Sequence, residues 1–243
     1  MIDLHTHILP GVDDGARTLD DALDMARAFV ADGMTAIAAT PHVRDDYPTS
    51  SDAMLRAVDA LRQALEGKGI PLTVLPGAEL AVEWLARLGK AELGRLTLAG
   101  SGRYILVETP YYGWPLGLPD SLFSLRAHGI TPVLAHPERN AEVQASPERL
   151  SELVESGVLV QVTAASVDGR IGQRARDCGL QLIREGLAHL LASDAHHASV
   201  RAVGMGAAAE SVGGKDLATW LTRDVPAAIV GDTPIPPRPD GGS

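Results

Sequence analysis

The first residues of the chain bring metal-ligating side chains together at close spacing. In the segment MIDLHTHILPGVDDG a short apolar run ends in His5 and His7, and Asp13 and Asp14 follow in the next loop. On an extended segment, a His-x-His pair places both imidazoles on the same face. Imidazoles and carboxylates are typical ligands of transition metals. A lone pair of this kind is weak evidence for a metal and is more often unrelated to one, so the rest of the chain must decide.

The elements that would position these side chains follow from hydrophobic periodicity. Short runs rich in Ile, Val and Leu alternate with segments of helical spacing, which is typical of a parallel sheet with crossover helices. Seven strands are predicted, at residues 1–5, 34–40, 72–75, 104–107, 130–135, 158–163 and 188–193. A first helix is predicted after Thr18, and others at residues 51–65, 80–88, 121–128, 147–156 and 170–186. We interpret residues 1–230 as one domain and residues 231–243 as a loose Pro/Gly-rich tail.

Six of the seven predicted strands end in residues that can bind a metal, and the sixth strand offers none. In a parallel barrel the carboxyl ends of the strands emerge on one face, so side chains there converge although they are far apart in sequence. The strand-end residues are His5, His7, His42, Glu79, Glu108, His136, Asp194 and His196. Asp13 or Asp14 would add a ninth ligand. Each residue alone fits a structural role, but such a cluster of imidazoles and carboxylates needs cations to be stable.

The donor types restrict the metal and the chemistry. Mixed nitrogen and oxygen donors without a thiolate suit Mn, Fe or Zn, whereas an all-oxygen set would favour Mg or Ca. Nine ligands can hold two or three ions. Such a cluster lowers the pKa of a bridging water to about 7 and so provides hydroxide at neutral pH. The sequence therefore predicts a hydrolase, most naturally one that acts on phosphate esters.

Two arginines lie where they could bind a phosphoryl group. Arg139 and Arg201 each follow a strand-end histidine by a few residues, and a guanidinium binds phosphoryl oxygens in a bidentate manner. The alternative for these residues is a surface salt bridge, with Glu138 or Glu142 as partner. We interpret both arginines as catalytic.

An aromatic segment follows one of the predicted ligands. Tyr111, Tyr112 and Trp114 come soon after Glu108, where a phosphoaryl ring could stack on them. Alternatively, this loop packs onto the rim of the sheet.

One pattern suggests a different phosphatase chemistry. Cys178 and Arg184 have the Cys-x5-Arg spacing of thiol-dependent phosphatases, but the residues between them are typical of an amphipathic helix and lack a glycine-rich phosphate cradle. We therefore expect no catalytic role for the cysteine.

The bulk properties restrict the partners. The 243 residues carry a net charge of −10, which argues against a broad surface that binds nucleic acid. No apolar run approaches the roughly 20 residues of a membrane span, so neither membrane insertion nor a signal peptide is expected. A single cysteine forms no intrachain disulfide, and we expect a cytoplasmic protein.

The combined motifs identify a resemblance. The segments MIDLHTHILPGVDDGA, ATPH, GAEL, VETP, AHPERN and SDAHH resemble those of the bacterial capsule and exopolysaccharide tyrosine-protein phosphatases of the polymerase and histidinol phosphatase (PHP) superfamily. The match runs from Met1 to about Met205. The resemblance implies an α/β fold with a distorted seven-stranded (β/α) barrel and a trinuclear metal centre, usually described as manganese-dependent. It also implies a phosphotyrosine protein as substrate, namely the C-terminal tail of a bacterial tyrosine autokinase that controls polysaccharide export.

The resemblance also assigns roles to individual residues. It makes Arg139 and Arg201 the phosphate-binding arginines. Only the resemblance selects Asp14 rather than Asp13 as a ligand. The implied metal ligands are His5, His7, Asp14, His42, Glu79, Glu108, His136, Asp194 and His196. The segment AVGMGAAAE after Arg201 departs from the family pattern, which bears on substrate specificity more than on chemistry.

Several functions remain open at this point. The leading prediction is a phosphomonoesterase that hydrolyses phosphotyrosine by means of a metal-bridging hydroxide. The alternatives are a small-molecule phosphatase of the same superfamily, such as one acting on histidinol phosphate, a TatD-like metal-dependent nuclease, and a catalytically silent metal-binding module. An oligomer is compatible with the sequence.

Overall fold

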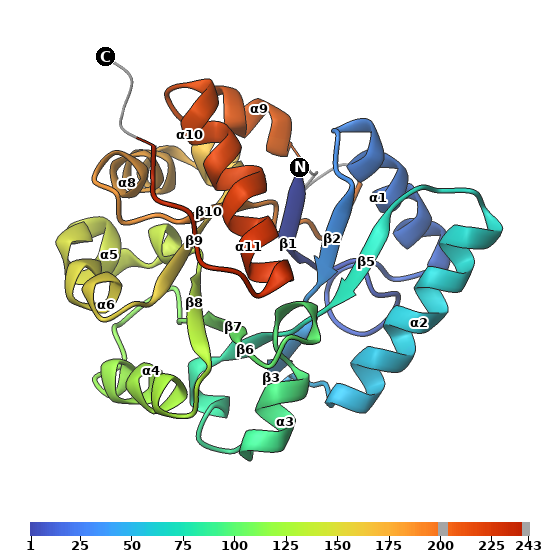
Figure 1. The fold of residues 1–243 in the computed structure, drawn as a ribbon, viewed down its shortest axis with the longest axis horizontal. Coiled ribbons are helices and arrows are strands. Elements are labelled where there is room, and N and C mark those ends of the chain that lie inside the picture. Colours follow the sequence, from blue (N-terminus) through green and yellow to red (C-terminus); the bar gives the residue numbers. More distant parts are fainter. Residues whose placement is uncertain (199–203, 240–243) are drawn as a thin grey trace.

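The strands form two hydrogen-bonded sheets surrounded by helices (Figure 1). The computed structural model describes residues 1–198 and 204–239. The smaller sheet has the order β1-β2-β5, and the larger one β10-β9-β8-β7-β6-β3-β4. The strands are β1 (Ile2–Thr6), β2 (Ala36–Ala39), β3 (His42–Arg44), β4 (Tyr47–Pro48), β5 (Thr73–Pro76), β6 (Glu79–Ala81), β7 (Tyr104–Glu108), β8 (Thr131–Ala135), β9 (Leu159–Thr163) and β10 (Leu190–Ala192). Neighbouring strands run parallel except β3 and β4.

The two sheets are connected where single segments of chain pass from one to the other. Residues 40–41 separate β2 from β3, and residues 77–78 separate β5 from β6. Pro41 has no backbone N–H to continue a ladder, so the predicted strand at 34–40 ends and a new strand begins at His42. The helix predicted at residues 80–88 is wrong, because its first residues lie in β6 and a 3-10 turn, η1 (Val82–Trp84), follows.

The outer edges of the sheets also meet. Beyond β1, the backbone N–H of His7 donates to the carbonyl of Ala195 at 2.9 Å, and that of Asp194 donates to the carbonyl of His5 at 2.9 Å. These bonds bring β1 beside β10, as Figure 1 shows. Within the described residues the ladders nevertheless remain two sheets and not one continuous barrel.

The helices lie outside the strands. In Figure 1, α1 and α2 lie beside the smaller sheet, and α4, α5, α6 and α8 lie on the opposite side of the molecule. Their bounds are α1 (Leu19–Ala31), α2 (Ser51–Gly67), α3 (Lys90–Arg95), α4 (Leu118–Ala127), α5 (Ala141–Ala145), α6 (Ser151–Glu155), α7 (Ala164–Val167), α8 (Gln173–Arg184), α9 (Met205–Glu210), α10 (Lys215–Thr219) and α11 (Val225–Gly231). None of the helices in the described parts of the chain is long and apolar enough to span a membrane.

The beginning of the C-terminal tail packs against the body. The indole of Trp220 donates to the carbonyl of Pro236 at 3.0 Å, and Arg238 donates to the carbonyl of Ile183 at 2.7 Å. Up to residue 239 the segment is therefore held in place by hydrogen bonds, although its Pro/Gly-rich composition suggests a loose tail.

Candidate metal centre

Strand register brings the predicted ligands together at one end of the sheets. His42 pairs with Glu79 across β3 and β6, and Glu108 pairs with Ala135 across β7 and β8. His136 then follows Ala135 directly. His42 and Glu79 begin β3 and β6 just after the chain leaves β2 and β5, whereas Glu108 and His136 lie at the ends of β7 and β8, so side chains from distant parts of the sequence become neighbours there.

Two of the strand-end residues have unusual backbone conformations. His136 and Asp194 adopt left-handed φ angles of 34° and 52°. Non-glycine residues rarely adopt this conformation, and where they do it commonly marks a functional site. Here the turns end β8 and redirect the chain after β10, so that both side chains point toward the cluster.

Glu79 lies at the centre of the cluster and is fully buried. Its Oε2 lies 3.2 Å from the Nε2 of His5, 3.4 Å from the Nε2 of His7 and 3.0 Å from the Nδ1 of His42. Its Oε1 lies 2.9 Å from the Nε2 of His136. Four imidazoles thus surround one carboxylate, two from the end of β1, one from the start of β3 and one from the end of β8.

Asp194 is the second buried carboxylate of the cluster. Its Oδ1 lies 3.3 Å from the Nε2 of His7 and 3.5 Å from the Nε2 of His5. Its Oδ2 accepts a hydrogen bond from Arg139 at 2.6 Å. The Cζ of Arg139 lies 4.7 Å from the centre of the Tyr111 ring, so this arginine lies between a carboxylate and an aromatic face. The partner of Arg139 is therefore a cluster residue, not Glu138 or Glu142.

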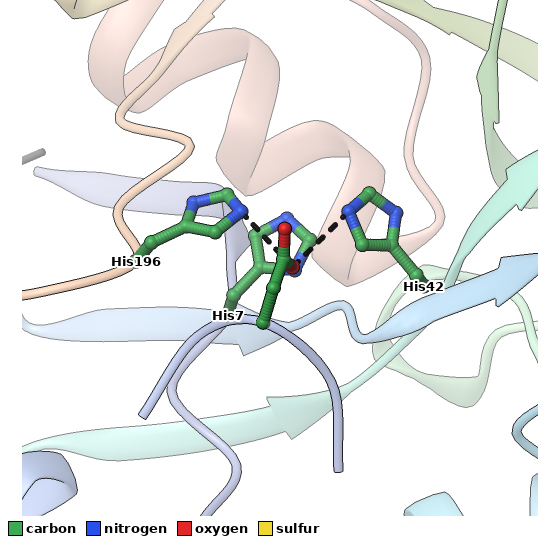
Figure 2. Close-up of side chains that lie close together, drawn as sticks. His7, His42 and His196 are labelled. Atoms are coloured by element: carbon green, nitrogen blue, oxygen red, sulfur yellow. Dashed lines mark ion pairs between the residues drawn. The ribbon is translucent and has the colours of Figure 1, made fainter. Parts of the chain in front are cut away.

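The two aspartates of the first loop have different places. The Oδ1 of Asp14 lies 3.5 Å from the Nε2 of His42 and 3.4 Å from the Nε2 of His196. Figure 2 shows these ion pairs as dashed lines and the rings of His7, His42 and His196 gathered around one point. Asp13 lies behind His7 and accepts a hydrogen bond from its Nδ1 at 2.7 Å. Asp13 thus turns the Nε2 of His7 toward the cluster.

All nine predicted ligands fall into groups whose donor atoms lie within 4.8 Å of one another. The groups are His7, Asp14, His42 and His196; His5, Glu79 and His136; His5, His7 and Asp194; and His42, Glu79 and Glu108. The shared members join these groups into one continuous cluster.

The cluster has the properties of a site built for cations. The Nδ1 of His42 and the Oε2 of Glu79 are buried and 3.0 Å apart, yet neither has a hydrogen-bond partner. Unpaired polar atoms are costly in a protein interior, and a shared cation would satisfy both. The residues present therefore fit a metal centre.

The close packing of ionisable side chains shifts the pKa values of cluster residues in the metal-free protein. Burial opposes protonation of His5, but the charges of Glu79 and Asp194 outweigh it and raise the pKa of His5 to about 8. Burial and the Glu79 charge raise the pKa of Glu108 to about 8. Protons thus occupy positions where cations would bind, and metal binding is expected to release them.

Two residues of the site were not anticipated from the sequence. Gln161 lies on β9, the strand that offers no ligand, and its Oε1 accepts from the Nδ1 of His5 at 3.0 Å and from the backbone N–H of His136 at 3.3 Å. Its signal in the sequence is a polar residue within the apolar strand LVQVT. Arg44 lies at the end of β3, two residues after His42.

A cavity of about 180 Å³ opens at the cluster. It is lined by Asp14, His42, Arg44, Glu108, Tyr111, His136, Asp194 and His196. Of the aromatic segment, Tyr111 thus reaches the site, whereas Tyr112 is 84% exposed and Trp114 packs against the core. Arg201 lies outside the described residues.

Cys178 is remote from this chemistry. It lies in α8, as expected from its helical surroundings, and its thiol contacts the carbonyl of Val143 at 3.9 Å. Burial raises the pKa of the Cys178 thiol to about 12, which suppresses the nucleophilic thiolate.

Comparison with known proteins identifies the family. The chain matches the family described as "Capsular polysaccharide synthesis, CpsB/CapC" over residues 1–230. It belongs to the CpsB/CapC family. The family predicted from the sequence motifs is thereby confirmed.

Individual members of the CpsB/CapC family are similar over most of the chain. The tyrosine-protein phosphatase YwqE of Bacillus subtilis (strain 168) is 39% identical over 202 residues, which cover 83% of this chain and 79% of YwqE. The tyrosine-protein phosphatase CpsB of Streptococcus agalactiae serotype III (strain NEM316) is 28% identical over 211 residues, covering 83% of this chain and 85% of CpsB.

The fold is also similar to that of a solved family structure. A structure described as "Crystal structures of YwqE from Bacillus subtilis and CpsB from Streptococcus pneumoniae, unique metal-dependent tyrosine phosphatases" superposes with a TM-score of 0.88 and 34% identity, covering 99% of both chains. The predicted α/β fold is confirmed by this match.

Replacing Gln161 tests whether its amide orients the cluster. Gln161→Leu removes the acceptor that holds the Nδ1–H of His5, so we expect metal affinity to fall about 10- to 100-fold. Titration with Mn²⁺ against a competing chelator measures this affinity. Gln181→Leu in α8, where the amide donates to exposed Glu185 at 2.8 Å, is the matched control. Equal metal affinities of the Gln161→Leu variant and the control would contradict the assigned role.

A buried glutamate next to Arg139 predicts a pH dependence of stability. Burial raises the pKa of Glu138 to about 7, while its Oε1 accepts from the Thr163 N–H at 3.0 Å and the Ser166 hydroxyl at 2.6 Å. The folded state thus holds this proton more tightly than the unfolded state, whose glutamate titrates near 4.5. The contribution of Glu138 to the free energy of unfolding should therefore fall by about 3 kcal/mol as the pH rises from 4.5 to 7.

Urea denaturation of metal-free protein at several pH values measures this effect. The amide of Glu138→Gln stays neutral at every pH. The difference in free energy of unfolding between the variant and the wild type should therefore shift in favour of the variant as the pH rises from 4.5 to 7. Glu142→Gln, at an exposed position, should retain the wild-type pH dependence. Parallel curves for the wild type and Glu138→Gln would show that Glu138 is not protonated in the folded state.

Proposed function

We propose that this protein is a metal-dependent phosphomonoesterase that hydrolyses phosphotyrosine on proteins. The observation that carries the proposal is the convergence of nine residues with nitrogen or oxygen donors, buried Glu79 among them, with a guanidinium beside the cluster. The relatives YwqE and CpsB are named tyrosine-protein phosphatases, which supports this activity over the alternatives.

Nine residues would hold the metal ions. They are His5, His7, Asp14, His42, Glu79, Glu108, His136, Asp194 and His196. Their number suits two or three divalent ions, and their mixed donors suit Mn, with Fe or Zn as alternatives. When bound, such ions activate water and neutralise charge on a phosphoryl group. Asp14 is proposed as the ligand because it faces His42 and His196, whereas Asp13 supports His7 from behind.

The chain's own residues bind and orient the substrate. Arg139 would donate to the phosphoryl oxygens, since a guanidinium offers paired N–H groups to an oxyanion. We assign the same role to Arg201. Burial, with a smaller contribution from Arg139, lowers the pKa of His136 to about 4, so His136 is neutral at pH 7 and available as a ligand.

A protein substrate fits the surface next to the cavity. Tyr111 lines the cavity, and Tyr112 and Leu116 in the same loop are 84% and 98% exposed. Exposed apolar side chains beside a polar site commonly mark a surface that binds a partner. We propose that this partner is the C-terminal tail of a bacterial tyrosine autokinase of polysaccharide biosynthesis, and that the protein acts in the cytoplasm.

The finer architecture is part of the same proposal. We infer that residues 1–230 are a single domain whose two sheets form a distorted seven-stranded barrel, with residues 231–243 as its tail. The pairing of β1 with the segment after β10 supports this description. Closed oligomers are common among soluble proteins, and an oligomer is compatible with this fold.

Metal addition to chelator-treated protein tests the proposed activity. Phosphate release is measured from a phosphotyrosine peptide and from histidinol phosphate, with Mn, Mg, Zn and Fe added singly. We expect Mn to restore turnover, with preference for the peptide. His136→Ala should lower the rate by at least about 100-fold, because it removes a ligand of the centre.

Cys178→Ser is the matched control for this experiment and should keep the wild-type rate. Loss of activity in that variant would indicate a cysteine-dependent reaction. Preference for histidinol phosphate would indicate a small-molecule phosphatase. If metal binds but no phosphomonoester is hydrolysed, the proposal fails, and cleavage of DNA would distinguish a nuclease from a silent metal-binding module.

A further inference from the structure

We propose that Arg44 binds the phosphoryl group of the substrate directly, as a cavity-lining guanidinium in addition to Arg139 and Arg201. This inference rests on the proposed function, because it assumes that an anionic phosphate ester enters the cavity. The observation behind it is that Arg44 lines the cavity at the candidate metal centre, whereas Arg139 is paired with Asp194 beside Tyr111.

The place of Arg44 in β3 explains how it reaches the cavity. Side chains two residues apart on a strand point to the same face, so the side chains of Arg44 and His42 lie on the same face of β3. The side chain of Arg44 is only 27% exposed. It thus approaches the site from the β3–β4 edge of the larger sheet, whereas Arg139 approaches from the turn after β8.

The hydrogen bonds of Arg44 leave donors directed at the cavity. Its Nε donates to Asp46 at 2.8 Å, whereas its terminal nitrogens lie 3.5 Å from the Oε2 of Glu108 and 3.9 Å from the Oδ2 of Asp14. The last two are charge contacts beyond ordinary hydrogen-bond length. Within the described residues, terminal N–H groups of Arg44 can therefore still donate to an oxyanion.

The neighbours of Arg44 hold the guanidinium in position. Besides the bond to Asp46, its Cζ lies 5.3 Å from the centre of the Tyr47 ring, and this ring stacks on His42 with centroids 6.0 Å apart. A guanidinium held by a carboxylate and an aromatic face loses less conformational freedom on binding. This arrangement suits a preformed phosphate-binding group.

The charges facing Arg44 explain why it would act only in the metal-loaded site. Glu108 and Asp14 are both candidate metal ligands. If bound cations shared the charge of these carboxylates, their attraction for Arg44 would weaken, and its terminal nitrogens would be available to an incoming phosphate while Nε stays bonded to Asp46. Arg44 thereby places a positive group in the cavity beside the carboxylates of Glu108 and Asp14.

Arg44→Met and Arg44→Lys test this role in the metal-loaded protein. The primary measurement is calorimetric binding of inorganic phosphate, which requires no turnover. We expect Arg44→Met to weaken phosphate binding at least about 10-fold and to lower kcat/KM for a phosphotyrosine peptide by about 100-fold. Arg44→Lys should recover part of both, because it restores the charge without the bidentate geometry.

Arg87→Met is the matched control. Arg87 also pairs with an aspartate, Asp45, and its Cζ lies 5.3 Å from the Trp84 ring, but it does not line the cavity. The Arg87→Met variant should bind inorganic phosphate with the same affinity as the wild type. Unchanged phosphate affinity in Arg44→Met would overturn the inference. So would an equal loss of Mn²⁺ affinity in Arg44→Met and Arg44→Lys, since that indicates a structural role. If the wild type binds phosphate but hydrolyses no phosphotyrosine, the proposed function fails while the binding test of Arg44 still stands.

Discussion

The burial of Glu79 among imidazoles is the constraint on which the rest of the structure depends. A fully buried carboxylate loses its hydration, and the cost is recovered only if positive charge or hydrogen bonds surround it. His5, His7, His42 and His136 all approach its two oxygens within 3.4 Å. One of these oxygens, Oε2, has no hydrogen-bond partner among the described residues, so a bound cation would complete the arrangement.

The architecture serves this cluster by starting or ending several strands at one place. The break at Pro41 starts β3 at His42, and the parallel register of β3 and β6 sets His42 beside Glu79. The left-handed turn at His136 and the hydrogen bonds between the segments after β1 and β10 bring the remaining candidate ligands to the cluster. Asp13 and Gln161 then fix the orientation of His7 and His5, so the ligands are supported by a second layer of buried hydrogen bonds.

The sequence predicted which side chains gather at the site better than it predicted the elements that carry them. His5, Glu108 and His136 follow apolar runs, and the chemistry of strand ends was sufficient to group them. Glu79 was expected after the strand at 72–75 but begins a separate three-residue strand, which is too short for periodicity to detect. The choice between Asp13 and Asp14 depends on loop geometry. Gln161 and Arg44 were missed because their roles arise from tertiary contacts and not from spacing.

Anomalous diffraction at the manganese edge, from crystals of the Mn²⁺-loaded protein, tests the central claim most directly. The account predicts two or three peaks inside the cluster, each within bonding distance of at least three of the nine donors. A single peak, or peaks only at surface carboxylates with the Glu79 cluster free of metal, would contradict it. In that case the buried charge of Glu79 would have to be balanced by protons on the surrounding imidazoles.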